Sequence, residues 1–162
     1  MALQSTDIVF RLSGGASNPT AASSLGGAKS SVPASSSLFD SVSGAEASAG
    51  DVEYRCIYIH NAGASPMNNA VAWLTANTPS PSTDIAIGLG ASAVNGTEQS
   101  VANESTAPAG VTFSAAASKA AGLALGTIPA GQHRAIWYRR TVSAGAAALA
   151  SDTCTLRVEC EA

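Results

Sequence analysis

The apolar residues of this chain fall into short runs, and glycine, proline, asparagine or serine closes almost every run. In the last run, Cys154, Leu156, Val158 and Cys160 alternate with polar and charged residues. A period of two places successive side chains on opposite faces of a β-strand, whereas a helix repeats every 3.6 residues. The pattern predicts about eight or nine short strands and at most one turn of helix, in 115–121. The expected strands are 8–12, 52–60, 70–76, 84–90, 98–102, 111–114, 123–128, 132–142 and 153–161.

Short strands at this spacing, with turn residues between them, are typical of two packed β-sheets. We therefore predict an all-β fold, a single-domain antiparallel β-sandwich over 1–162, with an immunoglobulin-like topology favoured over a jelly roll. The length of 162 residues supports one domain, because a chain of this size buries roughly two-thirds of its unfolded surface on folding.

The strand expected at 132–142 is apolar on both faces. Ala135 and Trp137 would lie on one face, and Ile136 and Tyr138 on the other. A strand of this kind lies in the interior of a protein. The sequence therefore predicts that this strand is covered on its outer side, either by another part of the chain or by a partner.

The segment 13–37 consists of Gly, Ala, Ser, Asn and Pro with almost no large side chains. It cannot bury enough apolar surface to offset the entropy lost on ordering. We expect a flexible arm or a long loop, and the arm is the candidate for clasping a neighbouring subunit. Residues 43–50 are also expected to be a loop.

Charged residues make up only 12% of the chain, and the net charge is −3. Proteins that bind nucleic acid need a basic stripe or patch, so nucleic-acid binding is not expected. No run of apolar residues is long enough to cross a membrane, and no membrane association is expected.

The chain has three cysteines, Cys56, Cys154 and Cys160, which are too few and wrongly spaced for a disulfide framework or a zinc site. We expect reduced cysteines buried in the core. The first residues lack a positive region followed by an apolar stretch, which favours synthesis in the cytoplasm.

No catalytic template fits the sequence. The two histidines, His60 and His133, are interpreted as polar strand residues at a sheet edge, because no metal-ligand spacing surrounds them. The glycine-rich 88–93 leads into a turn and not into a helix that could bind a pyrophosphate. We predict no catalytic residues, no cofactor and no bound metal.

Five segments together resemble a group of tailed-bacteriophage virion structural proteins, and the likeness covers nearly the whole chain. The resemblance implies a structural role in the particle and no catalytic residues. The segments are Asp7–Asn18, Ser24–Lys29, Glu53–Asn61, Ile85–Gly90 and Ile128–Val142.

The favoured function is a non-enzymatic capsid decoration (cement) protein that binds across capsomers. Its expected partners are the major capsid protein and itself, as a homo-oligomer such as a trimer at a local three-fold axis. Its expected location is the virion, after synthesis in the host bacterial cytoplasm. The alternatives are a tail, neck, baseplate or fibre component and, of another class, a carbohydrate-binding adsorption module that would use Trp73. The candidate interface residues are Leu25, Lys29, Arg134, Tyr138, Arg139 and Arg140.

Overall fold

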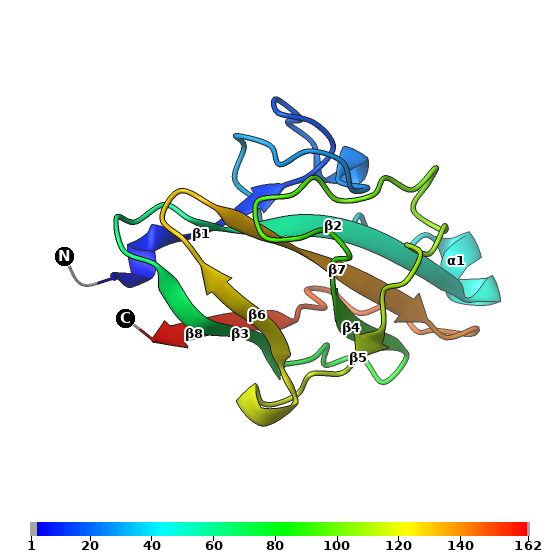
Figure 1. Cartoon of the computed structure of the whole chain (residues 1–162). Coiled ribbons are helices and arrows are strands. Elements are labelled where there is room, and N and C mark those ends of the chain that lie inside the picture. The colour runs from blue at the N-terminus through cyan, green and yellow to red at the C-terminus, as the bar shows by residue number, and fades with distance from the viewer. Residues whose placement is uncertain (1–2, 162) are drawn as a thin grey trace.

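A computed structural model of the chain describes residues 3–161 and has two antiparallel β-sheets packed face to face (Figure 1). The sheets do not close into a barrel, so the predicted β-sandwich is confirmed. The choice of an immunoglobulin-like over a jelly-roll topology stays a prediction. The five-stranded sheet has the order β1 (Ile8–Leu12), β2 (Asp51–Asn61), β7 (His133–Val142), β4 (Thr83–Leu89) and β5 (Phe113–Ser114). The three-stranded sheet has the order β6 (Leu123–Ile128), β3 (Met67–Ala76) and β8 (Thr155–Glu161).

The β2–β7 pair forms the centre of the five-stranded sheet. Its ladder runs from Asp51 opposite Val142 to His60 opposite His133. Because strand side chains alternate, each of these strands presents one face to the other sheet and one face outward. The inward face joins β3, β4 and β6 in the main hydrophobic core. Fully or nearly fully buried members of this core include Ile57, Ile59, Trp73, Ile87, Ile128 and Ile136.

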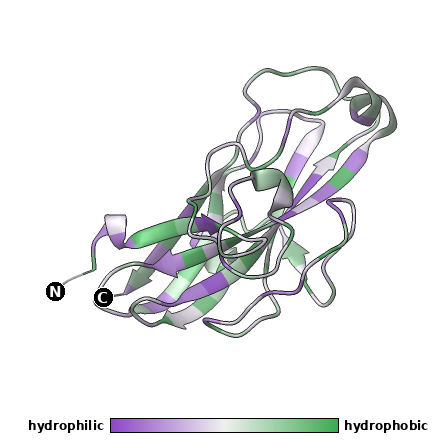
Figure 2. Ribbon diagram, turned by 90° about the horizontal axis from the view of Figure 1, so that it is seen from above, coloured by the Kyte–Doolittle hydropathy of each residue, from purple (hydrophilic) through white to green (hydrophobic). Residues whose placement is uncertain are grey.

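A second, smaller core lies on the outward face of the same two strands. Cys56 and Tyr58 of β2 pack there with Ala135 and Trp137 of β7, and all four are buried. Two long irregular segments cover this face, one between β1 and β2 and one between β4 and β5 (Figure 1). The outer cover predicted for the strand with two apolar faces is therefore confirmed, and it comes from the chain itself. Seen from above, the most hydrophobic positions lie mainly in the strands beneath this cover (Figure 2).

The segment 13–37 takes the long-loop form of the prediction, because it packs on its own sheet. Ser13, Ser24 and Ser30 are fully buried. The hydroxyls of Ser13 and Ser24 both donate to the carbonyl of Cys56, at 2.9 and 2.6 Å. Hydrogen bonds from small polar side chains thus hold this segment on the sheet, although it lacks large apolar side chains. Composition alone does not indicate these hydrogen bonds.

The strand boundaries confirm most of the expected elements and correct three. Residues 98–102 form no strand and make only one isolated bridge, Glu98 with Gly27. The expected strand 111–114 shrinks to β5. Residues Gly44–Ala49 form a short helix, α1, instead of a loop, and Ser43 and Glu46 close its first turn as a capping box. A 3-10 turn at Lys119–Ala121 agrees with the single helical turn expected near 115–121. No helix within residues 3–161 is long and apolar enough to span a membrane.

Candidate functional site

Two of the six candidate interface residues lie inside the protein. Tyr138 and Arg140 are only 6% and 7% exposed, because their side chains point from β7 into the space between the sheets. The alternation of β7 places the side chains at 138 and 140 on the inward face, where they line the space between the sheets instead of an outer surface. Their role in an interface stays a prediction.

The other four candidates are half-buried at the surface. The guanidinium of Arg139 lies over the ring of Phe113, 5.4 Å from its centre, on the outer face. Lys29 and Leu25 belong to the covering segment, where the carbonyl of Leu25 accepts from the amide of Val101. Arg134 lies near the opposite end of β7 from Arg140. The structure does not bring these residues together into one surface patch with Tyr138 and Arg140.

Arg140 instead organises an ion-pair network at one end of the sandwich. Its guanidinium pairs with the buried carboxylate of Glu53, the residue opposite it on β2, and with Asp40 at 3.2 Å. It also donates to the backbone carbonyl of Asp40 at 2.6 Å. Burial raises the pKa of Glu53, and the positive charge of Arg140 opposes that shift. The network therefore holds two opposite charges together where water is excluded.

A second arginine extends the network to the edge of β2. Arg55, 1% exposed, pairs with the carboxylate of Glu104. The ring of Phe39 lies against both guanidinium groups, with its centre 5.5 Å from Arg55 and 4.9 Å from Arg140. The alternation of β2 carries a signal for these pairs. Glu53 and Arg55 share a face with Ile57 and Ile59, and buried charges on an apolar face require partners.

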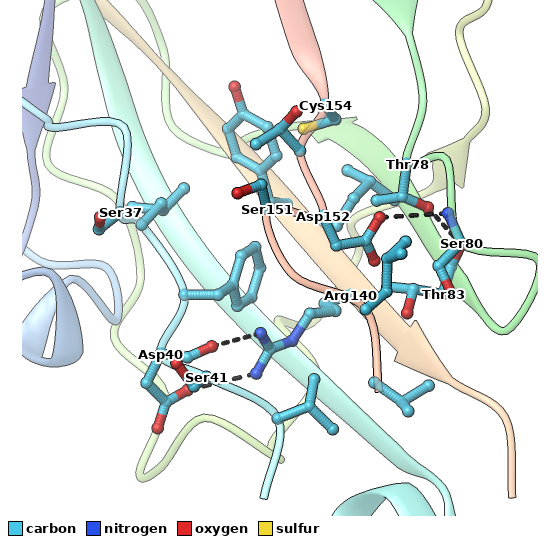
Figure 3. Close-up of a pocket in the computed structure, with 18 of the residues that line it drawn as sticks. Ser37, Asp40, Ser41, Thr78, Ser80, Thr83, Arg140, Ser151, Asp152 and Cys154 are labelled. Carbon is cyan, nitrogen blue, oxygen red and sulfur yellow. Dashed lines mark hydrogen bonds and ion pairs between the residues drawn. The ribbon is translucent and has the colours of Figure 1, made fainter. Parts of the chain in front are cut away.

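A cleft of about 1050 Å³ opens between the sheets beside this network (Figure 3). Its floor includes Tyr138 and Arg140, and its walls come from residues 34–44, 146–156 and parts of β4. Most of the wall residues are Ser, Thr and Ala. The larger apolar lining residues are Phe10, Leu38, Phe39, Val42, Ile57, Ile85, Val142, Leu149 and Leu156.

Two side chains of the cleft, Cys154 and Asp152, carry ionisable groups whose surroundings the structure defines. Burial raises the pKa of the Cys154 thiol, so it is a poor nucleophile. Asp152 is occupied in accepting a hydrogen bond from the Ser80 amide at 3.2 Å (Figure 3). Among the described lining residues there is no histidine that could activate a serine hydroxyl.

Two groups of three carboxylates have oxygens within 4.8 Å of one another, and both include Glu53. Asp40, Glu53 and Glu104 form one group, in which each residue already pairs with an arginine. Glu46 and Asp51 complete the other group with Glu53.

The histidines and cysteines differ in part from their predicted positions. His60 and His133 face each other across β2 and β7, which are central strands, so the expected sheet-edge position is wrong. All three cysteines are free, and Cys56 is buried as predicted. Cys154, just before β8, and Cys160, within β8, are only half-buried, and β8 is an edge strand.

Compared with protein families, curated proteins and solved structures, the chain shows no match.

Proposed function

We propose that this protein is a non-enzymatic structural component of a tailed-phage virion, and that it decorates the capsid. The resemblance of its sequence to virion structural proteins supports the origin. The cleft at the open end of the sandwich supports a role in protein–protein contact, and it is the observation that carries the proposal.

The cleft lies beside a sheet edge that no other strand of the described chain pairs with. β8 ends the three-stranded sheet, and its side chains Leu156, Val158 and Cys160 are only half-buried. Leu149, at 50% exposure, stands at the wall of the same cleft. An extended segment from a neighbouring protein could hydrogen-bond to the free edge and cover these apolar groups.

Such a contact would stabilise a shell through repetition. A standard protein–protein interface buries about 1,600 Å² in total. A decoration protein repeats this contact at each site on the shell, and the low charge of the chain limits the desolvation that each contact costs. This protein would then add stability across capsomer boundaries without any chemical step.

The test is binding of the purified protein to capsids that lack it. Two glutamates at the cleft wall, Ala148→Glu and Leu149→Glu, replace exposed residues and should abolish co-sedimentation while leaving the fold intact. Ala107→Glu, an exposed alanine in the segment between β4 and β5, is the matched control and should bind normally. Full binding by the cleft variant would overturn the role of the cleft.

The number of copies per particle separates the two virion roles. Hundreds of copies on the shell support decoration, whereas tens or fewer would assign the protein to the tail, neck, baseplate or fibre. A carbohydrate-binding role is disfavoured, because Trp73 and Trp137 are buried and cannot offer a flat ring to a sugar. Saturable binding in a glycan screen would reverse that conclusion.

A further inference from the structure

Four basic side chains gather on the outer face of the five-stranded sheet, at the end away from Arg140. Arg11 of β1 lies opposite Tyr58, and His60 of β2 lies opposite His133 of β7. Side chains on directly opposed residues are about 4.5–5.5 Å apart at Cβ. The covering segment adds Lys29. The carbonyl of Gly27, two residues before it, accepts from the hydroxyl of Tyr58, and the Tyr58 ring packs edge-on against His133. Arg11, Lys29, His60 and His133 are called the basic cluster below.

Each member of the basic cluster is half-buried, and none has an acidic partner. The ion pairs among residues 3–161 use Arg55, Lys119, Arg140 and Arg157 instead. The ammonium of Lys29 makes neither a hydrogen bond nor an ion pair within those residues. Arg11 donates from one terminal nitrogen to the carbonyl of Ser31, while its buried Nε has no partner.

The cluster members disfavour one another's positive charge. Burial, and then the charge of Arg11, lower the pKa of Lys29. Burial and the charges of Lys29 and Arg11 lower the pKa of His60, although a hydrogen bond with the backbone of Gln132 opposes the shift. Burial, Lys29 and His60 likewise lower the pKa of His133, against a hydrogen bond with the backbone of Gly96.

The covering segment between β4 and β5 brings the carboxylate of Glu98 to this face, where it is already in use. Glu98 is 2% exposed and accepts from the amide of Ser92 at 2.9 Å. Burial opposes ionisation, yet hydrogen bonds, those of Ser92 foremost, keep the pKa of Glu98 below its ordinary value. Its charge raises the pKa of Cys56 and of Tyr58, which lie beneath it.

We propose that the basic cluster binds a carboxylate carried by an acidic protein segment. Partly buried cations without a counter-charge gain most from an anion that reaches them, and the arginine fork matches the two oxygens of a carboxylate. A duplex or single-stranded nucleic acid fits less well, because the cluster is compact and the chain has a net charge of −3. This inference goes beyond the capsid role and concerns the opposite face of the five-stranded sheet from the cleft.

The binding test uses glutarate and a hexaglutamate peptide as probes on the intact protein. We expect saturable binding, followed through the ring signals of His60 and His133 by NMR. Lys29→Met, which keeps the aliphatic stem, should weaken binding roughly tenfold through loss of one charge-assisted hydrogen bond. Lys119→Met removes an exposed lysine that pairs with Glu159, and should leave binding unchanged.

The pH dependence gives a second readout. The bound carboxylate favours protonated imidazole, so the complex holds more protons than the free protein. Both free histidines have a pKa below the ordinary 6.5. Affinity should therefore rise as the pH is lowered from about 8 to about 5.5.

Three results would overturn the proposal. The first is no saturable binding of either probe at about pH 5.5. The second is equal weakening by Lys29→Met and Lys119→Met, which would indicate non-specific attraction. The third is inorganic phosphate binding as tightly as glutarate, which would remove the carboxylate assignment. None of these outcomes bears on co-sedimentation with capsids, so the two proposals fail or stand separately.

Discussion

At the residue scale, the nearly buried ion pair of Arg140 and Glu53 is the contact whose loss we expect to destabilise the protein most. We expect Arg140→Met to destabilise the protein by about 3–5 kcal/mol, because the carboxylate of Glu53 stays buried without its partner. The double variant Glu53→Met, Arg140→Met removes both charges and should recover most of that loss. Urea unfolding at neutral pH measures each free energy.

The control for this cycle is an arginine whose ion pair lies at the surface. Arg157→Met breaks the pair with Glu159, in which both side chains are much more exposed, and should cost no more than about 1 kcal/mol. If Arg140→Met lowers the free energy of unfolding no more than Arg157→Met does, the buried pair contributes no more to stability than a surface pair. If the double variant is as unstable as the single one, the loss comes from packing and not from an unpaired charge.

At the scale of elements, buried serine hydroxyls and backbone hydrogen bonds together attach the covering segment between β1 and β2. Ser24 donates to the Cys56 carbonyl and accepts from the Ser13 amide at 2.8 Å. Ser24→Ala leaves the Ser13 amide without its acceptor and should cost about 1–3 kcal/mol. The Cys56 amide, which donates to the Ser24 carbonyl, should exchange its hydrogen faster.

Ser23→Ala provides the comparison one residue away. Ser23 is exposed, and its hydroxyl contacts only the Thr20 side chain, at 3.1 Å, so a change within about 0.5 kcal/mol is expected. Equal effects of the two substitutions would mean that the segment lies loosely on the sheet. Because of the same contacts, deletion of 13–37 should expose the outer core and destabilise the sandwich.

The sequence predicted elements well where the pattern was local. The run 8–12 was correct to the residue, because a polar Asp7 and the breaker Ser13-Gly14 bound it on both sides. The strand predicted at 98–102 is absent, because Glu98 forms a single bridge with Gly27 and no further strand pairing follows it. The helix at 44–49 carried a signal in its capping residues, but its Gly, Ala and Ser composition is typical of loops.

The candidate sites were less predictable, because their members are far apart in the chain. Glu53 and Arg140 are separated by 87 residues, and only the β2–β7 register brings them together. The same register places His60 beside His133. The alternation of residues in a sequence indicates which side chains share a face of a strand. It does not indicate which strands pair when they are far apart in the chain.

At the scale of the whole molecule, two cores share the same pair of strands. Trp73 lies in the core between the sheets, and Trp137 lies in the outer core under the covering segments. β2 and β7 line both cores through their alternate faces, so neither core can form without that pairing. The pairing closes a loop from Asp51 to Val142, which makes folding slow, with refolding expected in roughly milliseconds to seconds.

This arrangement predicts one cooperative transition seen equally by both tryptophans. Trp73→Phe and Trp137→Phe each leave a single fluorescent probe, in the outer core and the main core respectively. Each variant is referenced to its own far-UV circular dichroism, since either substitution also changes stability. Within each variant, fluorescence and circular dichroism should give the same urea midpoint and the same refolding rate. A lower urea midpoint for the Trp137 fluorescence alone would show that the outer cover opens as a separate unit. The β2–β7 pairing would then not couple the two cores.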